Sequence, residues 1–264
     1  MLEALNLFKT FNPGTANANT ALQGASLTLK EGDFVTVIGG NGAGKSTLLN
    51  AVAGVFPVDA GSIVIDGLDV TALPEHRRAQ WLGRVFQDPM MGTASKMLIY
   101  ENLSLAARRG QKRTLRWAFP KDELNSYREL LASLGLGLED RLATRVGLLS
   151  GGQRQALTLI MATLKRPKLL LLDEHTAALD PKTAQKVLEI TDKIISENSL
   201  TTMMVTHNMR DAIRHGNRLV MMDGGRVILD ISGEEKQKLT VDSLLERFFT
   251  AGGEEMPSDR MILS

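Results

Sequence analysis

Short apolar runs alternate with segments in which apolar residues recur at helical spacing along most of this chain. The apolar runs predict strands at residues 2–8, 21–29, 34–38, 169–172, 202–206 and 218–222. The first two have the pattern of an antiparallel pair, whereas the unbroken run at 169–172 is typical of a central parallel strand covered on both faces. Because strands alternate with helices, we predict an α/β fold with a largely parallel sheet.

Strand patterns fade in the middle of the chain, where helical spacing takes over at residues 97–109 and 122–134. A helical subdomain inserted into the α/β core explains this change, and the core includes an antiparallel β subdomain near its start. The polar end of the chain predicts a flexible tail. We therefore predict a single domain over residues 1–264, with its core at 1–86 and 147–252, the helical subdomain at 87–146 and the tail at 253–264.

Composition narrows the class of protein. The 264 residues are 43% hydrophobic, which is enough to bury a substantial core. Lys and Arg number 31 against 30 for Asp and Glu, so the charge balance gives no argument for a nucleic-acid partner. The absence of cysteine excludes a disulfide framework, a thiolate metal site and a cysteine nucleophile.

The chain carries no apolar run of about 18 to 20 residues, the length that a membrane-spanning helix needs. Its start contains Glu3 and Lys9 and is a poor secretory signal. We therefore expect the chain to stay inside the cell and to reach a membrane only through a partner.

A glycine loop follows the predicted strand at 34–38. Residues 39–46 match the pattern G-x-x-x-x-G-K-[ST] and lie between a strand pattern and a helical pattern. In such a loop backbone N–H groups surround a β-phosphate, and the next helix contributes the positive end of its dipole. We expect Lys45 to contact the β- and γ-phosphates and the Ser46 hydroxyl to bind Mg²⁺. The predicted nucleotide site contains Gly39, Asn41, Gly42, Ala43, Gly44, Lys45, Ser46 and Thr47.

Two carboxylates end the apolar run at 169–172. Ligands bind at the carboxyl ends of strands in open α/β sheets, and Asp173 and Glu174 lie at such an end. Asp173 is suited to hold Mg²⁺ through water, and Glu174 to polarise a water that attacks the γ-phosphate. Together with the glycine loop, these residues predict a P-loop NTPase (RecA-like) core, a class that includes kinases, helicases and GTPases.

A third motif selects one family from that class. The sequence Leu-Ser-Gly-Gly-Gln at residues 149–153 precedes a predicted helix at 154–165, where a serine hydroxyl and glycine N–H groups can form an anion site. It resembles the signature motif of the ABC ATPases. The resemblance implies that Ser150, Gly151, Gly152 and Gln153 serve the γ-phosphate of ATP bound by an opposite subunit, in a head-to-tail dimer around two ATP molecules.

Further residues resemble ABC landmarks in chain order. The resemblance implies that Phe11 stacks on adenine, although an early Phe is also a common core residue. It implies that Gln87 contacts Mg²⁺ or the attacking water and that His207 contacts the γ-phosphate. Asp180 matches the loop that crosses the dimer interface and, with Pro181 after it, also predicts the start of a helix through Asn198.

Two features depart from this pattern or lie outside it. His175 stands where the family usually has proline, so the site keeps Glu174 but lacks the fixed φ angle that proline gives the loop. Residues 108–116 hold five Lys or Arg and no acidic residue, followed by Trp117 and Phe119. This basic segment predicts either a solvated face or a contact with anionic lipid headgroups or a permease loop.

The resemblance implies the ATP-hydrolysing subunit of an ABC transporter, with ATP and Mg²⁺ as cofactors, most like a prokaryotic importer. Its expected partners are a second copy or a homologous ATPase, membrane-spanning permease subunits at the cytoplasmic face of the membrane and, indirectly, a substrate-binding protein. No nucleic acid is expected. Residues 11–15 and 85–91 resemble importer subunits for amino acids, particularly aromatic ones, although an ATPase does not touch the cargo.

Two other functions have matching motifs. The ATPase subunit of an ABC exporter shares every motif and stays open as an alternative. An ABC ATPase of DNA repair or translation carries a long coiled-coil insertion or a second cassette. The stretch between Lys45 and Ser150 leaves room for neither.

Overall fold

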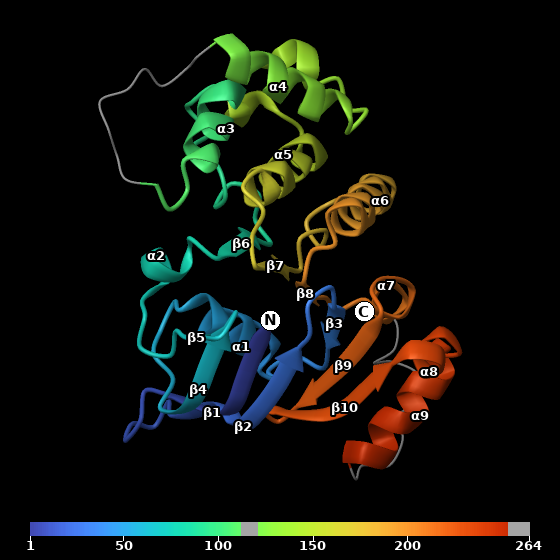
Figure 1. Cartoon of the computed structure of the whole chain (residues 1–264). Helices are drawn as coiled ribbons and strands as arrows, with labels where there is room; N and C mark the ends of the chain where they lie inside the picture. Colours follow the sequence, from blue (N-terminus) through green and yellow to red (C-terminus); the bar gives the residue numbers. More distant parts are fainter. Residues whose placement is uncertain (112–120, 253–264) are drawn as a thin grey trace.

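The computed structural model describes residues 1–111 and 121–252 and arranges their strands in two sheets (Figure 1). The antiparallel sheet has the order β2-β1-β4-β5, with strands at Asn19–Leu29, Leu2–Phe11, Ala60–Ile65 and Leu68–Asp69. The central sheet has the order β10-β9-β3-β8-β7-β6, with strands at Arg226–Ser232, Arg218–Asp223, Phe34–Ile38, Thr202–Val205, Leu169–Asp173 and Leu82–Val85. Neighbours in the central sheet are parallel except for β10 and β9.

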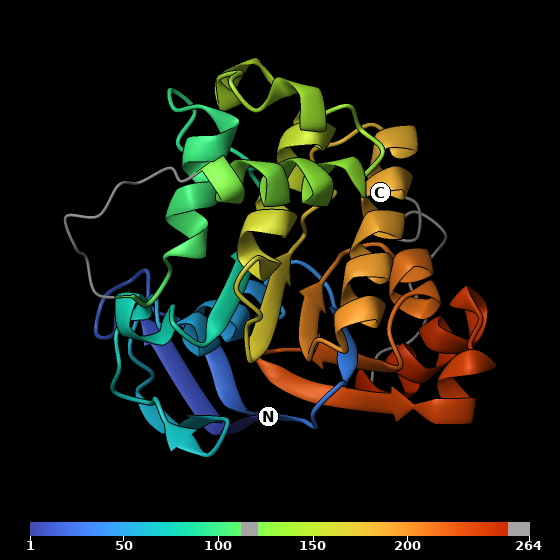
Figure 2. The ribbon, with the colours of Figure 1, turned by 45° about the horizontal axis from the view of Figure 1, so that its top comes forward.

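Helices cover both faces of the central sheet. Figure 2 shows the green and yellow helices of the middle of the chain grouped together. The red C-terminal helices lie beside β10, at the opposite end of the central sheet from β6. The helices are α1 Lys45–Ala53, α2 Glu75–Arg78, α3 Ile99–Ala107, α4 Lys121–Ala132, α5 Gly151–Thr163, α6 Pro181–Asn198, α7 Met209–Arg214, α8 Gly233–Gln237 and α9 Val241–Gly252. Within the described residues, no helix is long and apolar enough to cross a membrane.

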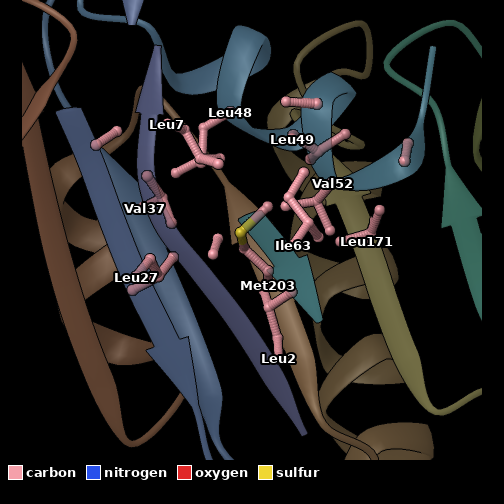
Figure 3. Packing of buried hydrophobic residues seen from close by; sticks show 14 of the residues in the cluster. Leu2, Leu7, Leu27, Val37, Leu48, Leu49, Val52, Ile63, Leu171 and Met203 are labelled. Atoms are coloured by element: carbon pink, nitrogen blue, oxygen red, sulfur yellow. The ribbon is translucent and has the colours of Figure 1, made fainter. Parts of the chain in front are cut away.

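Strand β7 divides its side chains between two cores. Leu169 and Leu171 belong to a core that α1 and the antiparallel sheet share, where Leu48, Leu49 and Val52 of α1 point toward residues of both sheets (Figure 3). Leu170 and Leu172 belong to a second core, which α3, α4, α5 and α6 build on the other face. Alternate side chains of a strand point to opposite faces, so an entirely apolar strand is what two covered faces require.

Most predicted elements are present, and the α/β fold class is confirmed. The antiparallel pair is β1 and β2, and the predicted strands of the parallel sheet match β3, β7, β8 and β9. Strands β4, β5, β6 and β10 were not predicted. β6 is only four residues long and contains a glycine and an arginine, so its sequence has little apolar pattern. Helix α5 begins at Gly151, ahead of the predicted start at residue 154, because Ser150 caps it.

The basic segment is only partly within the described residues. Arg108 forms an ion pair with Glu123 at 3.2 Å, and the Arg109 guanidinium donates to the carbonyl oxygen of Ala162 at 2.9 Å, near the end of α5. These two arginines therefore make internal contacts and are not simply solvated. Residues 112–120 and the predicted tail at 253–264 lie outside the described residues.

A buried arginine closes the C-terminal end of α1. Arg78 is 1% exposed, and its guanidinium donates to the carbonyl oxygens of Ala51 and Val52 at 2.8 and 2.9 Å. It also donates to the carbonyl oxygens of Leu73 and Thr71 at 2.8 and 3.0 Å. Burial lowers the pKa of Arg78 from its ordinary value. The carbonyl oxygens at a helix C-terminus carry partial negative charge, so they stabilise a cation placed there.

Replacing Arg78 with Met should lower the free energy of unfolding by about 3 to 5 kcal/mol, because four carbonyl oxygens lose their buried donor. Arg77 lies in the same helix and is exposed, so Arg77→Met should change that free energy by less than about 0.5 kcal/mol. Urea unfolding followed by circular dichroism measures both. Equal free energies for the two variants would show that the guanidinium of Arg78 does not stabilise the fold.

Candidate functional site

The glycine loop between β3 and α1 has backbone angles that only glycine adopts easily. Gly44 precedes α1 with φ of 94°, and a Cβ atom there would lie 2.5 Å from the carbonyl oxygen of Ala21. Gly39 has φ of 152°, and its Cβ atom would lie 2.2 Å from the carbonyl oxygen of Met222. These contacts explain why both positions are glycine. Asn41 and Gly42, between them, are exposed, while Ala43 is buried.

Lys45 is the first residue of α1 and is largely buried at the mouth of this loop. Its ammonium group donates to the carbonyl oxygens of Gly39 and Gly40 at 2.8 and 3.0 Å. Burial lowers the pKa of Lys45, and the negative charge of Glu174 opposes that effect. Ser46 and Thr47 complete the first turn of α1, with Ser46 exposed. The loop therefore presents a cation, a hydroxyl and a helix N-terminus at one place, which suits a phosphate chain.

Asp173 ends β7 next to a cation on the neighbouring strand. Arg84 of β6 lies 3.7 Å from the Asp173 carboxylate and also donates to the side-chain oxygen of Asn50 in α1. Burial raises the pKa of Asp173, while the charge of Arg84 lowers it and that of Glu174 raises it further. Arg84 was not predicted as a site residue, because its position beside Asp173 depends on a strand order that the sequence does not reveal.

Glu174 and His207 lie in contact at the ends of neighbouring strands. His207 Nδ1 is 3.3 Å from Glu174 Oε2. The Glu174 N–H donates to the carbonyl oxygen of Val205 at 3.0 Å, so the glutamate is held against the end of β8. Its φ angle is 42°, a left-handed conformation that is uncommon for residues other than glycine.

His175 is buried beneath this pair. Its side chain is 2% exposed, and Nε2 lies 3.1 Å from the Thr191 hydroxyl of α6. Burial lowers the pKa of His175 to about 4, the positive charge of His215 lowers it as well, and Asp192 opposes both. His215 in turn contacts Asp192 at 2.6 Å. The imidazole of His175 is therefore neutral at neutral pH.

Of the remaining predicted residues, some lie at the carboxyl ends of the central strands, as Glu174 does, and others lie elsewhere in the fold. Gln87 follows β6, which pairs in parallel with β7, so it emerges at the edge that carries Glu174. Gln155 of α5 donates to the carbonyl oxygen of Phe86 at 3.1 Å and so links this loop to α5. Phe11 ends β1 and makes an edge contact with Phe56, with ring centres 5.1 Å apart.

The signature residues form the start of α5. Ser150 caps the helix: its hydroxyl accepts from the Gln153 N–H, and the Gln153 side chain accepts from the Ser150 N–H, both at 3.3 Å. Ser150 and Gly151 are exposed and Gly152 is buried. Among the hydrogen bonds of the described residues, none joins residues 150–153 to the glycine loop at 39–47. The N-terminus of α5 is therefore a separate candidate anion site.

Asp180 caps α6 as predicted. Its carboxylate accepts from the Thr183 N–H at 3.1 Å, and Pro181 is the first helical residue. The hydrogen bonds from Thr183 lower the pKa of Asp180. The side chain is exposed at the start of α6, close in sequence to Glu174, so a partner can reach it.

No cluster of three or more His, Asp or Glu side chains in the described part of the chain could hold a metal ion by itself. Mg²⁺ commonly binds to one or two carboxylates together with the phosphates of a nucleotide. The donors here, Asp173 and the Ser46 hydroxyl, fit that kind of shared coordination.

Known proteins resemble this chain over nearly its whole length. A family model described as "ABC transporter" matches residues 22–177. A tyrosine transport ATP-binding protein of Clostridioides difficile (strain R20291) is 46% identical over 248 residues, which is 94% of this chain and 98% of the relative. The thiamine import ATP-binding protein ThiQ of Escherichia coli (strain K12) is 34% identical over 76% of this chain and 82% of its own length. A solved dimeric ATP-binding cassette in a post-hydrolysis state, bound to ADP and phosphate, is 28% identical with a TM-score of 0.75, covering 88% of this chain and 98% of its own.

Replacing Lys45 with Ala should reduce phosphate release from Mg-ATP at least about a hundredfold, because the cation assigned to the phosphates is lost. Lys30→Ala removes an exposed lysine that precedes β3, at the opposite end of that strand from the glycine loop, and should leave the rate unchanged. A phosphate-release assay and nucleotide titration measure both effects. Substantial turnover by the Lys45 variant would contradict the assignment of the glycine loop.

Proposed function

This chain belongs to the ABC transporter family, and on that premise we propose that it powers transport by closing head to tail with a second ATPase subunit around two ATP molecules. Its family membership makes it an ATP-binding subunit that couples ATP hydrolysis to transport, and its relatives include import subunits. The separate anion site at the start of α5 supports the dimer, because Ser150 is exposed and has no hydrogen bond to the glycine loop of its own chain. The solved relative bound to ADP and phosphate is itself dimeric.

In this dimer each ATP lies between the glycine loop of one subunit and residues 150–153 of the other. Lys45 neutralises the β- and γ-phosphates, and the Ser46 hydroxyl and the Asp173 carboxylate would hold Mg²⁺, with Gln87 as a further candidate ligand. When bound, Mg²⁺ would supply positive charge that offsets the negative charge developing on the phosphates during hydrolysis. Phe11 supports the adenine, and Asp180 lies where the two subunits meet.

The contact between Glu174 and His207 carries the catalytic part of the proposal. A general base must lie within hydrogen-bond reach of the proton it removes. Glu174 follows β7 at the same end of the central sheet as the glycine loop, which follows β3. His207, 53% exposed, can contact the γ-phosphate while it orients the glutamate. Glu174 therefore accepts the proton of the attacking water, and His207 positions the carboxylate and the phosphate.

We propose permease subunits as the partners that the helical region, residues 87–146, contacts at the cytoplasmic face of a membrane. Among the described residues, four large apolar side chains are exposed in or beside that region: Met90 at 43%, Met91 at 70%, Leu105 at 58% and Leu148 at 72%. Exposed apolar side chains of this size are common at protein interfaces. A substrate-binding protein would deliver the cargo to the permease. The tyrosine transport relative supports an aromatic amino acid as that cargo.

Glu174→Gln should bind Mg-ATP and accumulate as an ATP-bound dimer while phosphate release falls at least about a hundredfold, because an amide keeps the size and cannot accept the proton. Size-exclusion chromatography with Mg-ATP and a phosphate-release assay measure the two effects.

His207→Ala is the comparison for this experiment, and it should also slow phosphate release while Glu174 remains. A rate near that of the unmodified chain for Glu174→Gln would overturn the assignment of the base. A monomeric Glu174→Gln variant at saturating Mg-ATP would count against closure of two chains around the nucleotide.

A further inference from the structure

The residue after Glu174 is anchored to a helix in the core. His175 buries its side chain between the end of β7 and α6, where its Nε2 atom lies 3.1 Å from the Thr191 hydroxyl oxygen. Thr191 is itself 0% exposed. The side chain of His175 therefore points into the protein, away from the end of the central sheet where the nucleotide is proposed to bind. In this position it has no direct catalytic role.

The hydrogen bonds of Thr191 fix the direction of this contact. The Thr191 hydroxyl donates its single proton to the carbonyl oxygen of Val187 at 2.8 Å, one turn earlier in α6. The same oxygen can then only accept from His175, so Nε2 of the imidazole carries the proton and donates. In this hydrogen bond from the catalytic loop to α6, His175 is the donor and Thr191 the acceptor, so Nε2 must carry a proton; in the neutral imidazole that is the Nε2–H tautomer.

The backbone of Glu174 needs such support. Its φ angle of 42° is a left-handed conformation, which persists only where the surroundings hold it. On one side the Glu174 N–H donates to Val205 of β8, and after it the Ala177 N–H donates to the Glu174 carbonyl oxygen at 2.9 Å. The sheet thus holds the peptide before Glu174, and the Ala177 N–H together with the side chain of His175 holds the peptide after it.

We propose that His175 is a positioning residue for Glu174, whose ring ties the strained peptide to α6 through Thr191 and so keeps the carboxylate beside His207. This inference rests on the proposed role of Glu174 as the base. A proline at this position would restrain the loop through its own φ angle. Here a hydrogen bond to the core takes the place of that ring, which explains how the site keeps its geometry without proline.

Four substitutions in the full-length chain test the link. His175→Leu removes the donor and Thr191→Val removes the acceptor, whereas His175→Gln and Thr191→Ser keep a donor and an acceptor at similar reach. We expect the first two to lower kcat for ATP hydrolysis about tenfold to a hundredfold with the KM for ATP within about twofold, because a shift of about 1 Å in a catalytic group has effects of this size. The two conservative variants should stay within about threefold of the unmodified rate.

A matched control separates positioning from a general loss of packing. Thr202→Val removes another fully buried hydroxyl, at the opposite end of β8 from Glu174, and should leave kcat unchanged. Thermal melting of each variant checks that it is folded. If His175→Leu fails to fold, Thr191→Val, which leaves the imidazole in place, carries the test.

The double variant Glu174→Gln with His175→Leu identifies where His175 acts. If it acts through Glu174, the double variant should be no slower than Glu174→Gln alone. The proposal would be overturned if His175→Leu slowed the Glu174→Gln variant by the same factor as it slows the unmodified chain. It would also be overturned if both His175→Leu and Thr191→Val kept a kcat within about twofold of the unmodified chain, or if His175→Gln were as slow as His175→Leu. Turnover near the normal rate by Glu174→Gln alone would instead overturn the base assignment, so the two failures are distinguishable.

Discussion

The parallel pairing of β3, β8 and β7 is the constraint on which the rest of the structure depends. Val37 pairs with Val205, and Asp173 also pairs with Val205 across the next gap, so the three strands end at the same level. Their carboxyl ends consequently deliver the glycine loop, His207 and the pair Asp173 and Glu174 to a single edge. Residues distant in sequence become one site because the strands share a direction and a register.

The edge stays in place because both faces of these strands are packed. Alternate leucines of β7 enter two different cores, and α1 inserts its apolar side into one of them (Figure 3). The buried guanidinium of Arg78 closes the far end of α1, so the helix that begins at Lys45 is fixed at both ends. A close-packed core deforms little, which is what a site built on unusual backbone angles at Gly39 and Glu174 requires.

How much the sequence predicted depended on whether the information was local. The leucine run at 169–172 and the glycine loop carry their own pattern, so the central strands, α1 and the P-loop class followed from them. The partners of Arg84 and His175 did not, because Asp173 approaches Arg84 across a strand pair and Thr191 approaches His175 from a helix whose packing no local pattern encodes. The absence of proline at residue 175 was visible in the sequence, whereas the hydrogen bond that replaces its effect became visible only in the fold.

The central claim is that each nucleotide lies between the glycine loop of one chain and Ser150 of another, and cross-linking tests it directly. The chain has no cysteine, and a side chain added at Gly40 meets no atom within 4 Å, so Gly40→Cys and Ser150→Cys can be made in separate chains. A short bismaleimide should join the two variants into a covalent dimer when they are mixed with Mg-ATP, and neither variant should cross-link alone. A mixture that stays monomeric with Mg-ATP, or cross-links equally without nucleotide, would contradict the account.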